Sequence, residues 1–262
     1  MARTSDHPRV RVGGLKTARL SRKDLMAQMV ADCANARIDA GHVPKLIFTA
    51  NGHTVALAAT DRGFRGLLDE ADIVHADGQP VVFASRWLTG TPIPERSATT
   101  DFIHDAAQAA EAHGLRFYLL GGTEEVNARC ADALRLRYPR LRIVGRRNGY
   151  FARDEEAAIC EEIHRCGADV VWVGLGVPLQ QEFCVRNRER LSAGWLVTCG
   201  GCFNFLTGDY ARAPGWMQRA GLEWLHRLWC NPRRLWRRYL LTNPLAAFLL
   251  LVSTSSLKEA RG

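Results

Sequence analysis

The sequence predicts an α/β fold, in which a mostly parallel β-sheet is flanked by helices and followed by a helical C-terminal appendage. Short apolar segments, typical of buried strands, alternate with helical segments from residue 21 to residue 210. Most of these apolar segments end in glycine or polar residues, and after Asp209 the chain becomes rich in arginine, tryptophan and leucine. We therefore expect a basic N-terminal arm over 1–20, an α/β catalytic domain over 21–210 and an Arg/Trp-rich helical appendage over 211–262.

Helix caps and apolar periodicity define the elements in the first half of the domain. Ser21 is a favourable N-cap, and apolar side chains recur behind it at helical spacing from Leu25 to Cys33. Thr99 or Thr100 caps a later helix, which Gly114 ends. In chain order we expect a helix from 21, a strand at 45–49, a helix from about 54, a strand at 72–75, a helix at 80–88, a loop at 89–97 and a helix ending at 114.

Acidic first turns, glycines and prolines mark the elements of the second half. Glu124 and Glu125 favour the start of a helix that Pro139 closes, and Gly167 stops the next one. In chain order we expect strand 115–120, a helix from 124, strand 141–144, helix 154–166, strand 169–173, a helix to about 191 and strand 195–198. Two appendage helices, 215–230 and 232–252, are separated at Asn231-Pro232.

Polar or glycine-rich residues follow five of the predicted strands. In parallel α/β sheets, ligands bind beyond the carboxyl ends of the strands. The rule selects segments 49–51, 77–78, 121–122, 174–176 and 200–204. Asp77 is the candidate for acid–base chemistry, because a carboxylate there can take a proton from a substrate hydroxyl. An aspartate that only caps the next helix is the equal alternative.

Two glycine turns, Gly121-Gly122 and Gly174-x-Gly176, each end a strand and open a helix. Glycine lets backbone N–H groups approach a phosphate at such a position, and a tight turn without a ligand is the alternative for each. A nucleotide-dependent oxidoreductase would need a complete G-x-G-x-x-G, but Leu179 occupies the third glycine position. The chain also lacks a P-loop, which argues against an ATPase.

The appendage is strongly basic. The chain has a net charge of +8, and residues 212–238 contribute most of it, with a single acid, Glu223, among seven arginines. Four of the seven tryptophans also fall here, and arginine with tryptophan beside an apolar run is typical of an interfacial helix. One alternative is that these arginines form an ordinary solvated helix face without a function. A second alternative is that the protein is a non-enzymatic module that binds membrane or nucleic acid. The arginines are Arg212, Arg219, Arg227, Arg233, Arg234, Arg237 and Arg238.

The apolar run at 244–252 is too short to span a bilayer, which needs roughly 20 apolar residues, but it could lie in an interface. It is also a candidate subunit contact for a homo-oligomer. The N-terminus is polar and basic, without an apolar signal region, and the eight cysteines are scattered. These features favour a cytoplasmic protein.

Ordered motifs between residues 45 and 240 carry a family resemblance. They are TAN at 49–51, ADIVHADGQP at 71–80, GTPIPER at 90–96, FYLLGGT at 117–123, NGYF at 148–151, VGLGVPLQ at 173–180, GGCFNFLTG at 200–208, RAPGWMQR at 212–219, GLEWLHRL at 221–228 and PRRLWRRYL at 232–240. Together they make the chain similar to the WecG/TagA/CpsF family of glycosyltransferases (glycosyltransferase family 26).

The resemblance implies a Rossmann-like fold and an inverting transferase that moves a hexose or N-acetylhexosamine from a UDP-sugar to a polyprenyl-diphosphate-linked sugar. Asp77 matches the proposed general base, and the appendage would close over the site and contact the membrane. The other matching positions are Thr49, Asn51, Arg96 and Gln180 in the domain and Arg227, Arg234 and Arg237 in the appendage. With the glycine turns at Gly121, Gly122, Gly174, Gly176 and Gly201, and with Asn204, these complete the expected site.

A departure from the family pattern and a missing motif refine this expectation. The family often has E-R-V-T-G where this chain has E-R-S-A-T-T at 95–100, and we take this to favour exopolysaccharide assembly with a glucose-type donor. Asp-x-Asp, the metal-holding pair of many sugar-nucleotide transferases, is missing. We therefore expect no metal and no cofactor, with arginine neutralising the UDP leaving group. The expected partners are the two substrates and the inner face of the cell membrane, to which the protein binds peripherally, and not nucleic acid.

Overall fold

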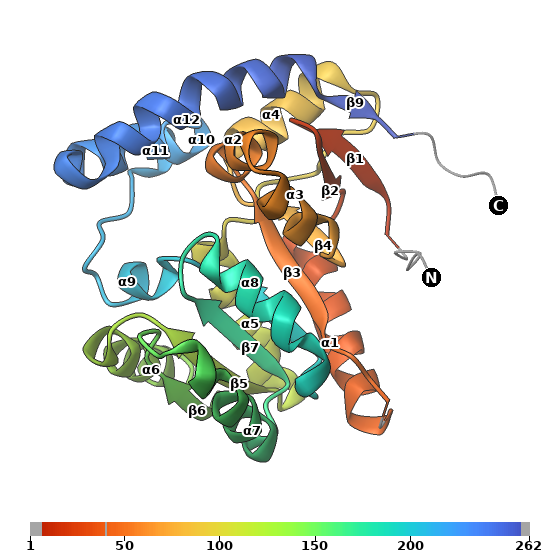
Figure 1. The fold of residues 1–262 in the computed structure, drawn as a ribbon, viewed down its shortest axis with the longest axis vertical. Helices are drawn as coiled ribbons and strands as arrows, with labels where there is room; N and C mark the ends of the chain where they lie inside the picture. The colour runs from red at the N-terminus through yellow and green to blue at the C-terminus, as the bar shows by residue number, and fades with distance from the viewer. Residues whose placement is uncertain (1–6, 40, 258–262) are drawn as a thin grey trace. The chain divides into compact units, whose positions relative to one another are not determined.

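The computed structural model describes residues 7–39 and 41–257 (Figure 1). The main sheet has the strand order β4-β3-β8-β7-β5-β6, and a small sheet has the order β2-β1-β9. The strands are β1 (Arg9–Val12), β2 (Leu15–Ala18), β3 (Lys45–Ala50), β4 (Ile73–Ala76), β5 (Arg116–Gly121), β6 (Arg142–Arg147), β7 (Val170–Gly174), β8 (Trp195–Thr198) and β9 (Ser255–Ser256).

Twelve α-helices are present in the described part of the chain, with 3₁₀ turns at Arg153–Glu155 and Arg188–Arg190. They are α1 (Arg22–Ile38), α2 (Gly52–Thr60), α3 (Arg62–Asp69), α4 (Gln79–Leu88), α5 (Thr99–His113), α6 (Glu124–Arg137), α7 (Glu156–Cys166), α8 (Leu179–Asn187), α9 (Cys202–Leu206), α10 (Gly215–Arg219), α11 (Glu223–Cys230) and α12 (Pro232–Val252). Parallel pairing joins β3 to β8, β8 to β7, β7 to β5 and β5 to β6. The predicted α/β fold with a parallel, helix-flanked sheet is confirmed.

One compact unit comprises residues 23–48 and 99–210. Within it, β7 and β8 consist of buried, mostly apolar residues, as expected of strands covered on both faces. Trp172 of β7 and Trp195 of β8 are fully buried, and their ring centroids lie 5.8 and 6.3 Å from that of Phe102. Burying one large apolar side chain contributes about 1.5–3 kcal/mol, so this cluster fixes α5, which carries Phe102, on the sheet.

The other compact unit comprises residues 1–22, 49–98 and 211–262. In it α12 runs along α2 (Figure 1), so closely that a Cβ at Gly52 would lie 3.5 Å from that of Ala246. The turn between β1 and β2 contacts the end of α12, where Gly14 N donates to Ser253 O at 2.8 Å. The predicted appendage therefore packs with α2 and α4. The functional boundaries at residues 20 and 210 stay predictions.

Several features of the structure were not predicted from the sequence. Residues 9–18 form an antiparallel hairpin within the expected arm, whose first six residues lie outside the described part of the chain. The expected helix at 215–230 is divided into α10 and α11, because Gly221 between them adopts a φ of +74°, which ends a right-handed helix. The short helix α9 follows the turn at Gly200-Gly201.

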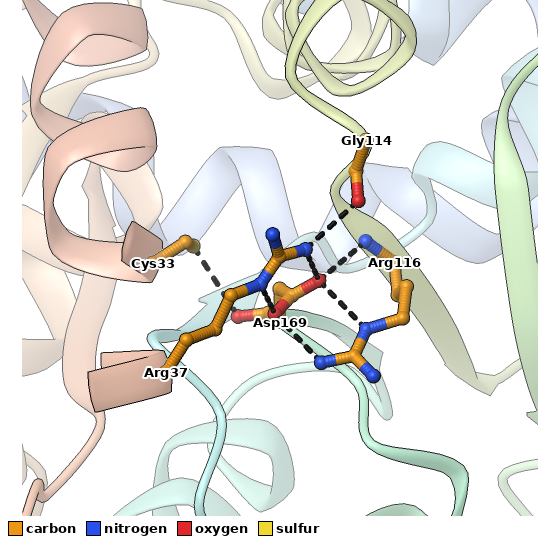
Figure 2. A network of polar contacts seen from close by, with 5 residues as sticks. All are labelled: Cys33, Arg37, Gly114, Arg116 and Asp169. Carbon is orange, nitrogen blue, oxygen red and sulfur yellow. Dashed lines mark hydrogen bonds and ion pairs between the residues drawn. The ribbon is translucent and has the colours of Figure 1, made fainter. Parts of the chain in front are cut away.

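A buried ionic network lies at the amino end of β7 (Figure 2). Asp169 precedes the strand, is 3% exposed, and accepts hydrogen bonds from Arg37 Nε and Nη2 at 2.8 and 2.7 Å. It also accepts from the backbone N, Nε and Nη2 of Arg116 at 2.7, 3.0 and 3.1 Å. Burial opposes ionisation of Asp169, but the hydrogen bonds from both arginines outweigh it, and the pKa lies below its ordinary value. The network ties α1 and β5 to β7 at the end of the strand opposite Gly174.

Candidate active site

Asp77 comes directly after β4, where the predicted site rim begins. The backbone N–H groups of Asp77 and Gly78 both donate to Ala50 O, at 3.0 and 3.2 Å, which holds the end of β4 against the end of β3. Asp77 is half-buried, and its Oδ2 accepts from Asn51 Nδ2 at 3.1 Å. A carboxylate that is restrained by an amide and still reaches solvent is suited to accept a proton from a bound hydroxyl.

Asn51 is held in place because it caps α2. Its Oδ1 accepts from Thr54 N at 3.1 Å, and its own N–H donates to Thr54 Oγ1 at 2.9 Å. With Oδ1 used at the helix, Nδ2 is the group that points to Asp77, so the amide orientation follows from its contacts. Thr49 is buried near the end of β3, two residues earlier. The structure thus brings Asn51 and Asp77 into contact, and Thr49 lies two residues before Asn51.

Arg96 lies in the loop that follows α4. The N–H of the next residue, Ser97, donates to Ala76 O at 2.8 Å, which fixes the loop beside the end of β4. The Arg96 guanidinium donates through Nη1 to Glu223 Oε2 and through Nη2 to Gln218 Oε1, both at 2.8 Å. The loop that carries Arg96 is therefore attached to Asp77's strand on one side and to the appendage on the other.

The glycine turns of the other unit come close to one another. A Cβ at Gly121, whose φ is +139°, would lie 2.4 Å from Gly174 O, so only glycine allows this approach of β5 and β7. Gly122 N donates to Gly174 O at 3.3 Å, and Gly149 N donates to Gly122 O at 2.8 Å. At Gly176 the φ is +80°, and an added Cβ would meet open space. The turns at the ends of β5 and β7 thus form one tight backbone assembly.

Gln180 and Asn204 support the neighbouring turn at Gly200-Gly201. Gln180 is 2% exposed, and its Oε1 accepts from Gly200 N at 2.9 Å. Asn204 N donates to Gly201 O at 3.2 Å. Both predicted residues therefore contact this turn, and the substrate-binding role predicted for them stays a prediction.

The appendage arginines occupy different settings. Arg227 on α11 is half-buried, whereas Arg237 on α12 is exposed with its guanidinium carbon 5.2 Å from the ring centroid of Trp236. The side chain of Arg234 lies outside the described part of the chain. The roles predicted for these three arginines stay predictions.

One residue beside the Asp77 site, His53, was missed by the sequence analysis. His53 is in the first turn of α2, next to the cap residue Asn51, and burial together with the nearby Arg238 of α12 lowers its pKa to about 4. A neutral imidazole therefore lies near a cation at this edge of the unit. The basic pattern of the appendage included Arg238, but no sequence signal linked His53 to it, because the pairing depends on how α12 packs on α2.

Large apolar side chains are exposed along the appendage. The exposed fraction reaches 86% at Trp229 and 73% at Leu241. Across the described residues, every helix is either too short or too polar to cross a bilayer. No group of three or more His, Cys, Asp or Glu side chains in that same part of the chain is arranged to hold a metal ion.

A restrained carboxylate follows β4 in one unit, and tight glycine turns follow β5 and β7 in the other, features that are typical of α/β enzymes. Residues 10–260 match the glycosyl transferase WecG/TagA/CpsF family, and the chain belongs to this family of glycosyltransferases. It is 31% identical over 195 residues to N-acetylglucosaminyldiphosphoundecaprenol N-acetyl-beta-D-mannosaminyltransferase of Bacillus subtilis (strain 168), covering 74% of this chain and 75% of the relative. It is 32% identical over 194 residues to the protein of the same name from Bacillus spizizenii (strain ATCC 23059 / NRRL B-14472 / W23), covering 74% of each.

Family membership decides between the functional classes that the sequence left open. The predicted resemblance and the predicted glycosyltransferase activity are confirmed. The two alternatives, a nucleotide-dependent oxidoreductase and a non-enzymatic basic module, are wrong.

Proposed function

We propose that this glycosyltransferase moves a hexose or N-acetylhexosamine from a UDP-sugar to a sugar on a polyprenyl diphosphate, with inversion at the anomeric carbon. The names of both Bacillus relatives describe N-acetylmannosaminyl transfer to N-acetylglucosaminyldiphosphoundecaprenol, which supports a lipid-diphosphate acceptor here. The observation that carries the proposal is the contact between Asp77 and Asn51 at the end of β4. We assign the product to cell-envelope or exopolysaccharide assembly.

Asp77 is the general base in the mechanism we propose. The acceptor hydroxyl attacks the anomeric carbon from the face opposite UDP, and Asp77 takes the hydroxyl proton as the new C–O bond forms. The bond from the anomeric carbon to the UDP oxygen breaks, and its electron pair leaves with UDP. Asn51 keeps the carboxylate oriented, because its amide is already fixed by the α2 cap. Backbone amides at the glycine turns and appendage arginines stabilise the charge that develops on UDP, without a metal.

We expect the loop after α4 to influence which donor sugar the protein uses. Ser97 and Ala98, where this chain departs from the common family pattern, are both buried, and Ser97 Oγ lies 3.0 Å from His75 Nδ1. Their side chains thus pack beneath the loop, so the departure would act on a donor only through the position of Arg96. The glucose-type donor stays a prediction, and UDP-N-acetylmannosamine is the donor that the relatives' names favour.

A UDP-release assay tests the function. The full chain is incubated with a synthetic polyprenyl-diphosphate-N-acetylglucosamine, a panel of UDP-sugars and EDTA. We expect acceptor-dependent release from one donor, and an Asp77→Asn variant that binds UDP but turns over about 10²–10⁴-fold more slowly. The control is Asp69→Asn, an exposed aspartate of α3 in the same unit. Wild-type turnover in Asp77→Asn would remove the general-base role, and the absence of release from every donor would contradict the transferase proposal.

We also propose that the appendage binds the inner face of the membrane peripherally. Trp229 and Leu241 expose much of their apolar surface, and exposed arginines such as Arg233 lie on the same two-helix segment. Each basic side chain near an anionic leaflet contributes about 1 kcal/mol, and tryptophan prefers the headgroup level. Deleting the appendage would strip α12 from α2, so point substitutions are the sharper test.

Cosedimentation with lipid vesicles tests membrane binding. We expect the full chain to pellet with phosphatidylglycerol vesicles and much less with phosphatidylcholine vesicles, and the double variant Trp229→Ser/Leu241→Ser to stay in the supernatant. Leu136→Ser is the matched control, since Leu136 is 86% exposed on α6, outside the appendage. Equal pelleting of the double variant and the wild type would refute this interface. Light scattering of the same samples tests the predicted homo-oligomer.

A further inference from the structure

A cluster of four polar side chains connects the loop after α4 to the appendage, entirely within one compact unit. Gln218 Oε1 accepts from Arg96 Nη2 at 2.8 Å and from Arg212 Nη2 at 3.0 Å. Gln218 Nε2 donates to Ala213 O at 2.7 Å, and Glu223 Oε2 accepts from Arg96 Nη1 at 2.8 Å. One neutral amide oxygen therefore lies between two arginines.

These contacts fix the orientation of the Gln218 side-chain amide. A flipped amide would direct N–H donors at two guanidinium groups, which have no acceptor, and an oxygen at the carbonyl of Ala213. Because both Nη2 atoms bond to the same oxygen, they lie no more than about 6 Å apart. Gln218 thus sets the spacing of Arg96 and Arg212.

Two of the four side chains in the cluster are guanidinium groups. Arg96 and Arg212 contribute two positive charges, and Glu223 is the only acid among the four residues. Arg96 is 12% exposed and Glu223 23%, so solvent screens these charges less than it would at an open surface. A purely structural bridge between two arginines would be served better by a carboxylate than by a neutral amide. An amide aligns the two guanidinium groups without taking up their charge, which favours a role in binding an anion.

The cluster adjoins the end of β4. Ser97 N bonds to Ala76 O, so Arg96 and Asp77 flank a single backbone hydrogen bond. On the appendage side, a Cβ at Gly221 would meet Pro80 in the first turn of α4 at 3.5 Å. The backbone of Arg96 thus lies next to that of Asp77, which we assign as the base, and Gln218 links Arg212 to Arg96.

We propose that Arg96 and Arg212 form one binding element for the diphosphate of a substrate, and that Gln218 and Glu223 are positioning residues that hold this pair. Two guanidinium forks at a fixed spacing match adjacent phosphate groups better than single charges do. The proposal rests on the proposed function in that both substrates carry a diphosphate. It adds Arg212 as a substrate-binding residue and gives the appendage a role at the site through Gln218.

Binding and steady-state kinetics of the full chain test the pair. Affinity for UDP and for inorganic pyrophosphate is measured by calorimetry, and KM is measured separately for the UDP-sugar and the lipid acceptor. We expect Arg212→Ala and Gln218→Leu each to weaken diphosphate binding or raise one KM by tenfold or more, with little change in kcat. Arg212→Lys should recover only part of the loss, because it restores the charge but not the fork. Arg62→Ala, an exposed arginine of α3 in the same unit, is the control and should behave as wild type.

The outcomes show which substrate supplies the diphosphate, and they distinguish a failure of this inference from a failure of the proposed function. Weaker UDP binding assigns the pair to the donor, and a raised acceptor KM with unchanged UDP binding assigns it to the lipid diphosphate. Arg212→Ala and Gln218→Leu variants that lose thermal stability but keep wild-type affinities and both KM values would overturn the inference. If the wild type transfers no sugar while pyrophosphate binding still depends on Arg212, the proposed function fails and the anion site stands.

Discussion

The buried network around Asp169 gives the sharpest stability prediction. Asp169→Asn keeps the size of the side chain but removes the charge that pairs with Arg37 and Arg116. Removing one partner of a buried ion pair costs about 3–5 kcal/mol. The two guanidinium groups remain 38% and 30% exposed and can regain water, so we expect the lower end of this range, about 3 kcal/mol. For a chain of this size, the melting temperature should then fall by about 6–12 °C.

Thermal unfolding followed by circular dichroism measures this loss at neutral and acidic pH. The pKa of Asp169 is depressed in the folded state, so its stabilisation is present above the unfolded-state pKa of about 3.9 and is lost as the pH falls through the folded value. The gap between variant and wild type should therefore close in acid. Asp209→Asn is the control, since Asp209 pairs with Arg129 near the surface, and we expect no measurable change. A melting temperature of Asp169→Asn within 1–2 °C of wild type, on the order of 0.5 kcal/mol, would refute the reasoning.

Three further predictions address other parts of the fold. The pKa of His53 is about 4 in the folded protein, against an ordinary value of 6.5, so the unfolded chain takes up the proton at a higher pH than the folded chain does. The stability of the fold should therefore decrease as the pH drops from 6.5 to 4. Melting curves across that range should show a weaker pH dependence for His53→Asn than for the wild type. Gly121→Ala should unfold or aggregate, because its Cβ would lie 2.4 Å from a carbonyl oxygen of β7, whereas Gly176→Ala meets open space and should cost only about 1–2 kcal/mol in urea titrations. Trp195→Phe removes the Nε1 donor 2.7 Å from buried Asp32 and should cost about 1–3 kcal/mol in the same assay.

The central fold was predictable because local signals agree with it. Each predicted strand from 45 to 198 corresponds to a strand of the main sheet, and the helix predicted at 232–252 has the bounds of α12. Gly167 ends α7 in the left-handed conformation, as its place after the helix indicated. Apolar runs, caps and glycines are local features, and a parallel sheet covered by helices satisfies all of them together.

The missed elements depend on contacts between residues far apart in the sequence. The hairpin at 9–18 pairs with β9 at the other end of the chain, so a local pattern of basic and apolar residues does not reveal it. The contact from Arg96 to Glu223 spans 127 positions, and only the presence of a single acid among seven arginines hinted at it. Side-chain partners of this kind follow from tertiary packing, which the sequence pattern constrains but does not specify.

Asp77 and Asp169 show how the same side chain serves two purposes at strand ends. Asp169 precedes β7, is 3% exposed and is surrounded by guanidinium donors, so its charge is compensated and cannot be offered to a ligand. Asp77 follows β4, is half-buried, and has a neutral amide from Asn51 as a partner, so its charge is oriented without being neutralised by that contact. In the function that we propose, the amide of Asn51 orients the Asp77 carboxylate for proton transfer, whereas the two arginines at Asp169 stabilise the fold.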